Sequence, residues 1–115
     1  ICVFTITDDR IVRRLEKAQA RGVKIRIISD NDKSMDSGSD LTHLSKSGID
    51  CRLDRTDAHM HHKFAISDQD LLLTGSYNWT RAAAAENDEN IVITNNPQLV
   101  RSFIEKFEKM WNQLD

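Results

Sequence analysis

No apolar run in this sequence reaches 18 residues, and no segment has the pattern of a secretory signal. No transmembrane helix and no cleaved leader are therefore predicted within these 115 residues. Internal repeats and low-complexity tracts are also missing, so a single domain covering residues 1–115 is predicted. The formal net charge of −2 and the pI of about 6.1 give no overall basic signature for nucleic acid, although they are compatible with a local basic groove.

Cysteine is scarce. Cys2 and Cys51 lie in apolar or alternating runs, where buried free thiols are favoured over a disulfide. Two cysteines cannot form a zinc site by themselves, and the histidines that would have to complete one match no zinc template in their spacing. We therefore expect no metal and no cofactor. The histidines are His43, His59, His61 and His62.

The order of apolar patterns predicts an α/β fold, with a mixed β-sheet flanked by helices. Asp8 and Asp9 suit the first turn of a helix that Gly22 ends, and Asn96 precedes a second long helix with proline at its first position. The core stripe expected on this second helix is Val100, Phe103, Ile104, Phe107, Met110 and Trp111. Strands are expected at 1–6, 23–28, 49–53, 63–67, 71–74 and, fully buried, 91–93, with a polar loop at 34–40 and a short helix at 41–48.

Five chemically useful side chains fall within 18 residues: His61, Lys63, Asp68, Ser76 and Asn78. An imidazole can attack phosphorus or move a proton, and an ammonium with neutral donors can hold phosphate oxygens as charge develops on them. Alternation along the strand places His61 and Lys63 on one face, whereas His62 falls on the other. Gly75 then ends the second strand of a hairpin and delivers Ser76 and Asn78 beside the first. These groups suit a phosphodiester site.

The pattern His61-x-Lys63-x4-Asp68-x6-Gly75-Ser76-x-Asn78 resembles the HKD motif of the phospholipase D superfamily. The phrases CVFTITDDRIV, MHHKFAI and GSYNWT are similar to its small single-motif members, the mitochondrial cardiolipin hydrolase or Zucchini group and the bacterial endonucleases. The resemblance implies a phospholipase D-like fold in which a strand and a helix precede Ile1, so the chain is expected to be truncated at its N-terminus. Any membrane anchor would lie in that missing part.

The resemblance also implies roles for the residues. His61, Lys63, Asp68 and Glu89 are the expected catalytic group, with Asp68 mainly a structural partner and Glu89 orienting His61. Lys63, Ser76 and Asn78 are expected to bind the substrate phosphate. The chemistry needs two imidazoles, one forming a phosphohistidine and one protonating the leaving oxygen. Because the chain carries one motif, a homodimer with a shared, metal-independent site is implied.

The substrate stays open between two classes. A nuclease acting on single-stranded RNA or DNA is favoured, since no long apolar loop flanks the motif, and a phospholipase acting on cardiolipin or a related lipid is the alternative. A binding protein with a vestigial site is disfavoured by the complete motif. The compartment is unknown; it is the mitochondrial outer membrane for a Zucchini-type protein and the cytoplasm for a bacterial one.

Two further features have two interpretations each. Tyr77 and Trp79 suit either base or lipid contacts or packing. A run of six basic residues between positions 10 and 24 is more often a solvated helix face than a substrate-binding patch. Its members are Arg10, Arg13, Arg14, Lys17, Arg21 and Lys24.

Overall fold

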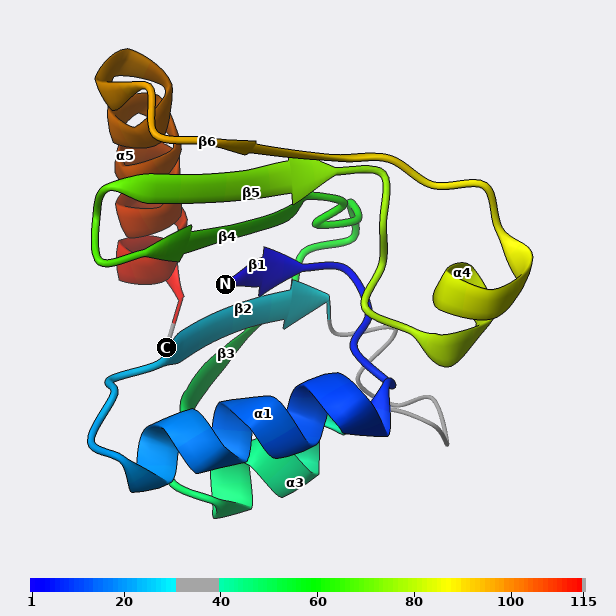
Figure 1. Ribbon diagram of the computed structural model, residues 1–115. Helices are drawn as coiled ribbons and strands as arrows, with labels where there is room; N and C mark the ends of the chain where they lie inside the picture. Colours follow the sequence, from blue (N-terminus) through cyan, green and yellow to red (C-terminus); the bar gives the residue numbers. More distant parts are fainter. Residues whose placement is uncertain (31–39, 115) are drawn as a thin grey trace.

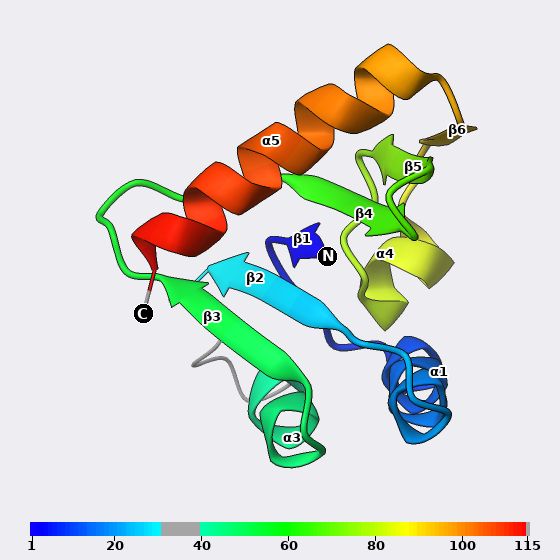
Figure 2. The same cartoon turned by 90° about the vertical axis from the view of Figure 1, so that its left-hand side faces the viewer.

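The computed structural model describes residues 1–30 and 40–114, which form a six-stranded mixed sheet with helices on both faces (Figures 1 and 2). The strand order is β3-β2-β1-β4-β5-β6, where β1, β2 and β3 are parallel and β4, β5 and β6 are antiparallel to their neighbours. The predicted α/β class with a mixed sheet is confirmed. The strands are β1 (Cys2–Val3), β2 (Arg26–Asp30), β3 (Asp50–Asp54), β4 (Lys63–Ser67), β5 (Leu71–Gly75) and β6 (Ile91–Thr94).

The helices are α1 (Asp9–Ala20), α3 (Leu41–Lys46), α4 (Arg81–Glu86) and α5 (Pro97–Gln113). The predicted cap of α5 is present, since Asn96 accepts hydrogen bonds from Gln98 N and Leu99 N. Asp9 lies in the first turn of α1 as expected, whereas Asp8 is its N-cap and accepts a hydrogen bond from Arg10 N. Helix α4 was not predicted, because six Ala-rich residues carry no apolar period; its usable signal is Thr80, whose hydroxyl accepts from Ala83 N. The polar loop predicted at 34–40 lies outside the described residues except for Asp40.

The sheet has an apolar cluster on each face. Phe64, Leu72 and Ile28 pack under α5, against its predicted stripe, of which Val100, Phe107 and Trp111 are the most deeply buried. The opposite face packs Ile27 and Ala65 with α1 and α3. Alternation along β4 is therefore confirmed. The two cysteines lie on opposite faces of the sheet, Cys2 in the first cluster and Cys51 against the second. Both thiols are free, and burial raises their pKa values to about 12 and about 11, respectively.

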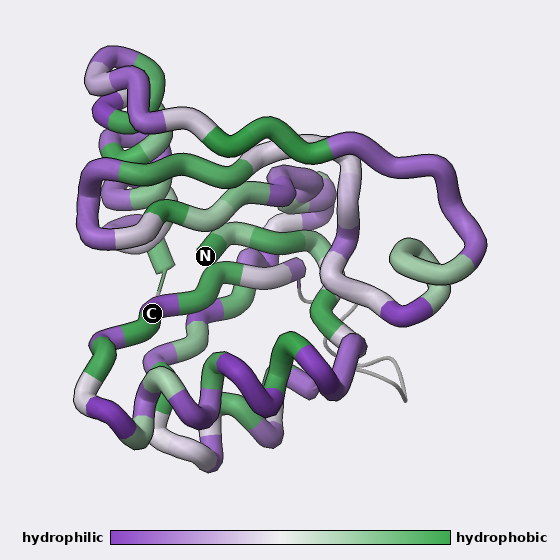
Figure 3. Tube along the Cα trace, viewed as in Figure 1, coloured by the Kyte–Doolittle hydropathy of each residue, from purple (hydrophilic) through white to green (hydrophobic). Residues whose placement is uncertain are grey.

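Three strand predictions need correction. The strand expected at 23–28 is shifted along the chain to Arg26–Asp30. The strand expected at 1–6 is only two residues long, after which Ile6 makes an isolated bridge with Trp79. The expectation that 91–93 is buried is wrong: Ile91, Val92 and Ile93 are 50%, 56% and 59% exposed. Figure 3 shows this apolar strand at the edge of the sheet. Sequence hydrophobicity could not reveal that β6 is an edge strand, because strand order is a tertiary property.

Candidate active site

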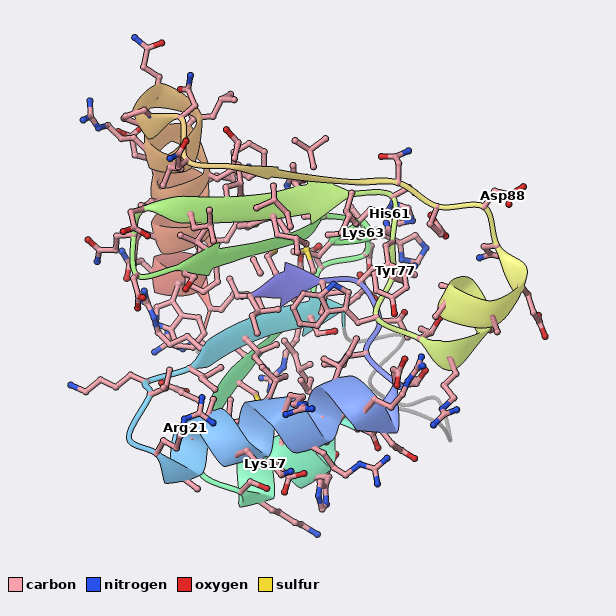
Figure 4. The ribbon with its side chains drawn as sticks, viewed as in Figure 1. Lys17, Arg21, His61, Lys63, Tyr77 and Asp88 are labelled. Carbon is pink, nitrogen blue, oxygen red and sulfur yellow. The ribbon has the colours of Figure 1, made fainter. Side chains whose placement is uncertain are left out.

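His61 and Lys63 lie together where the chain enters β4, beside the C-terminal ends of β1, β2 and β5 (Figures 1 and 4). The Lys63 Nζ lies 3.0 Å from the Nδ1 of His61 and donates to the His61 carbonyl oxygen at 2.8 Å. His61 is exposed, and none of the described residues hydrogen-bonds to its Nε2. The imidazole thus has one nitrogen held by a cation and the other directed to solvent or substrate.

Phe4 forms the floor below this pair, a role that sequence reasoning missed. Its ring centroid lies 4.8 Å from that of His61 and 5.7 Å from the Nζ of Lys63. On its other side, the His59 ring packs edge-on with centroids 5.4 Å apart. His62 instead packs edge-on against Phe64, below α5. The two adjacent histidines therefore face opposite sides of the sheet, as alternation predicted.

The segment before β4 is anchored by a buried carboxylate. Asp30, which ends β2 and is 1% exposed, accepts a hydrogen bond from the backbone N–H of Met60 at 2.8 Å. The Met60 side chain is buried against Cys2, whose thiol lies 3.3 Å from its sulfur. Residue 60 is thus held through both its backbone and its side chain. This fixes the direction in which the next residue, His61, leaves the core.

Glu89 lies in the α4–β6 connection but does not contact His61. It accepts hydrogen bonds from the hydroxyl of Ser76 and, at 3.3 Å, from the side-chain amide of Asn87. Its charge acts on Lys63: partial burial lowers the pKa of the ammonium, and the nearby Glu89 carboxylate opposes this shift. The predicted contact that would orient His61 is therefore absent from the described residues, and the carboxylate bonds to Ser76 and Asn87 instead.

Gly75 brings the loop after β5 against β6. A Cβ at this position would lie 2.1 Å from the carbonyl oxygen of Asn90, so no other residue fits without moving the backbone. The close approach lets Ser76 donate to Glu89 while its hydroxyl oxygen accepts from Asn90 N at 3.2 Å. The prediction that glycine is needed here agrees with this geometry, through close packing rather than an unusual φ.

Asn78 and its neighbours divide between site and core. The Oδ1 of Asn78 is buried, and the described residues provide it with no hydrogen-bond partner. Tyr77 is half-buried beside His61 and Lys63 (Figure 4), whereas Trp79 is 9% exposed and belongs to the core. Of the two interpretations of Trp79, contact with a base or lipid and packing, the structure therefore supports packing.

Asp68 lies away from the other predicted site residues. It follows β4, so the whole strand, about 16 Å at 3.3 Å per residue, separates it from Lys63. Asp68 and Gln69 have φ values of 55° and 64°, and Asp70 N donates to the Ser67 carbonyl, which describes a type I′ turn. Asp68 therefore does not reach His61 of the same chain. Its expected role as a structural partner agrees with its place in the turn, and its membership of the catalytic group stays a prediction.

Replacing Asp68 with asparagine is expected to leave kcat/KM within about threefold of the original. Asparagine adopts positive φ as readily as aspartate, so the turn and the register of β4 survive. The check is kcat/KM on a phosphodiester substrate, with the melting temperature measured in parallel. A loss of two or more orders of magnitude at an unchanged melting temperature would instead return Asp68 to the catalytic group.

Comparison with known proteins identifies the family. The family model described as "Cardiolipin synthase, PLD-like domain" matches residues 1–111. The chain belongs to the phospholipase D superfamily. It is 50% identical to the mitochondrial cardiolipin hydrolase of Chlamydomonas reinhardtii over 97% of this chain and 50% of that protein. The human protein of the same name is 40% identical, over all of this chain and 46% of its own length.

A solved structure extends this result to the fold. The phospholipase D family member Nuc from Salmonella typhimurium superposes with a TM-score of 0.91 at 34% identity, covering 99% of this chain and 77% of that one. The phospholipase D-like fold inferred from the motif is therefore confirmed. The chain spans about half the length of the curated relatives it matches.

Proposed function

We propose that this phospholipase D superfamily chain is the catalytic domain of a metal-independent phosphodiesterase, which cleaves single-stranded nucleic acid through a phosphohistidine on His61. The exposed imidazole beside the Lys63 ammonium, with Nζ 3.0 Å from Nδ1, is the observation that carries the proposal. A nucleophile and a fixed cation this close can engage one phosphate together, the nitrogen at phosphorus and the ammonium at a non-bridging oxygen.

Substrate phosphate also switches the tautomer of His61 in this proposal. While the Lys63 ammonium donates to Nδ1, a neutral imidazole carries its proton on Nε2 and cannot attack through that atom. Phosphate oxygens compete for the ammonium and draw it away from Nδ1. With Nδ1 released, the imidazole proton exchanges through solvent from Nε2 to Nδ1, which leaves the Nε2 lone pair free to attack phosphorus. A carboxylate that accepts a hydrogen bond from Nδ1–H holds this tautomer, and Glu89, whose charge already acts on Lys63, is the proposed acceptor. This keeps the orienting role of Glu89 for the substrate-bound state.

Ser76 and Asn78 complete the phosphate site in this scheme. Movement of Glu89 toward His61 frees the Ser76 hydroxyl, which it otherwise holds. Asn78 lies in the same loop after β5, and its side-chain NH2 can donate to a phosphate oxygen. Both side chains can stabilise the charge that develops on phosphate oxygens during attack.

A second imidazole must protonate the leaving oxygen, and we propose that it comes from His61 of a second copy. Two-fold symmetry brings the same residue from both subunits into one site without any further sequence. Bound substrate makes the two histidines inequivalent, so one is nucleophile while the other is acid. After the leaving group departs, the second imidazole acts as base for the water that cleaves the phosphohistidine.

Nucleic acid is favoured as substrate by the polar surroundings of the site. The segments at 54–59 and 86–90, which flank His61 and Glu89, are mostly exposed polar residues. A lipid substrate would require an apolar rim to receive its acyl chains. None of the described helices is long and apolar enough to cross a membrane.

The lipid alternative rests on the names of the relatives. Mitochondrial cardiolipin hydrolases are 40–50% identical to this chain, which keeps a phosphodiester lipid as the second candidate and favours the mitochondrial location of the two expected. Both substrates place a phosphodiester between two alcohols. The same His61 and Lys63 chemistry serves either.

One assay tests substrate and metal independence together. The purified protein is incubated with labelled single-stranded RNA, single-stranded DNA and cardiolipin vesicles, each with and without excess EDTA. Cleavage of nucleic acid at an unchanged rate in EDTA is expected, because His61 and Lys63 supply the nucleophile and the charge. Exclusive cardiolipin hydrolysis would establish the alternative, and activity lost in EDTA and restored by a divalent ion would overturn the metal-free mechanism.

A further inference from the structure

Basic residues are concentrated in α1 and the segment after it, in a chain that is acidic overall. Seven of the 16 Lys and Arg residues lie between Arg10 and Arg26, together with one acidic residue, Glu16. At 3.6 residues per turn, four of them fall within a sector of about 60° around the α1 axis and extend about 17 Å along it. We call this set the basic stripe: Arg10, Arg14, Lys17 and Arg21. All four are exposed.

Most of the stripe has no neutralising partner among the described residues. Arg10 pairs with Asp8, its Nη2 lying 2.6 Å from the carboxylate. Glu16 is directed to α3, where it lies 3.0 Å from His43. Arg14, Lys17 and Arg21 make no ion pair with any described carboxylate. Three adjacent cations without counter-charges repel one another, so an anionic ligand along α1 relieves that repulsion.

The stripe leads to the site. Its first member, Arg10, is close enough to Tyr77 for each to perturb the other electrostatically, and Tyr77 adjoins Lys63 (Figure 4). Figure 4 shows Lys17 and Arg21 farther along α1, toward its C-terminal end. The other approach is acidic, since Glu86, Asp88 and Glu89 lie in or beside the α4–β6 connection. A polyanion is therefore attracted along α1 and repelled along that connection.

We propose that the basic stripe of α1 is a binding track for the sugar–phosphate backbone of a single-stranded nucleic acid, which it guides to His61. The inference rests on the proposed function and names nucleic acid as the ligand. Cations in a line match a linear polyanion. A bilayer is a poorer match: a membrane-surface helix inserts its apolar face, whereas that of α1, formed by Val12, Ile11 and Leu15, packs in the protein core.

The test compares two double variants made in the protein at its natural length. Lys17→Gln/Arg21→Gln removes one lysine and one arginine from the stripe. Lys109→Gln/Arg101→Gln removes the same two residue types from the exposed side of α5, on the other face of the sheet. Affinity for a fluorescent single-stranded oligonucleotide is measured between 50 and 200 mM salt in a His61→Asn background, so that binding is read without cleavage. Turnover of bis(p-nitrophenyl) phosphate is measured with His61 present.

For a single strand, each lost phosphate contact lowers the salt slope by about 0.7 and the affinity by about fivefold at 0.1 M salt. The stripe variant is expected to lose about 25-fold in affinity, with turnover of the small substrate unchanged and the α5 variant close to the parent. Equal affinities of the two double variants would overturn the track. So would a stripe variant impaired on cardiolipin vesicles but not on oligonucleotides. A parent that binds oligonucleotide through the stripe but cleaves no phosphodiester would refute the proposed chemistry alone.

Discussion

The protein with His61 replaced by asparagine is expected to lose at least about 10³-fold in phosphodiester turnover while keeping its fold, because the residue supplies both the nucleophile and the proton donor of the proposed reaction. Asparagine is similar in size to imidazole but can neither attack phosphorus nor carry a transferable proton. His61 is exposed, and it contacts Lys63 and the ring of Phe4, so little packing is lost. Turnover of bis(p-nitrophenyl) phosphate and of a labelled oligonucleotide gives the measurement.

His62→Asn is the matched control. It makes the same chemical change one residue away, but on the face of β4 that packs toward Phe64 and α5. Its turnover is expected to remain within about fivefold of the parent. Melting temperatures are compared for both variants. A well-folded His61→Asn protein with turnover within tenfold of the parent would refute the site assignment.

Dimers that contain one normal and one His61→Asn subunit are expected to be essentially inactive. In a shared site, the loss of either imidazole removes the nucleophile or the acid. Co-refolding equal amounts of the two chains should leave about a quarter of the dimers active by random pairing. Two different affinity tags allow the mixed dimers to be purified and assayed by themselves, and light scattering reports the oligomeric state.

An independent site in each subunit predicts a different result, in which purified mixed dimers keep about half of the normal activity. The shared site would then be abandoned. The chain offers one alternative second imidazole, His59, which lies across the Phe4 ring from His61. A His59→Asn variant distinguishes the cases: it is near-normal for a shared His61 site and strongly impaired if His59 is the acid.

Much of the fold followed from short-range pattern. The period of α5, the Asn96 cap with its proline and the alternation in β4 are properties of neighbouring residues, and each was confirmed. The failures are of another kind. β1 is short because Phe4 already turns to contact the 59–62 segment, and β6 is exposed because it lies last in the sheet. Each depends on distant parts of the chain.

The site shows the same division. His61, Lys63, Ser76 and Asn78 were predicted from their order and spacing. The structure places His61 and Lys63 at the start of β4, and Ser76 and Asn78 directly after its antiparallel neighbour β5. Asp68 fitted the spacing of the motif equally well. It nevertheless lies at the opposite end of β4 from Lys63, because the residues between them form an extended strand. No motif could reveal Phe4 or Asp30. Phe4 packs beneath the His61 ring, and Asp30 accepts a hydrogen bond from the backbone N–H of Met60.

By itself, the sequence determined the family, the class of fold and the residue types available for phosphate chemistry, because these are recorded in local order and period. Only the tertiary structure decided that Glu89 bonds to Ser76 rather than to His61, that His59 and His61 pack against the same Phe4 ring, and that Arg10 at the start of α1 lies near Tyr77. Contacts between segments depend on strand order and helix placement. They arise from the burial of apolar faces by the whole chain, and no window of neighbouring residues contains them.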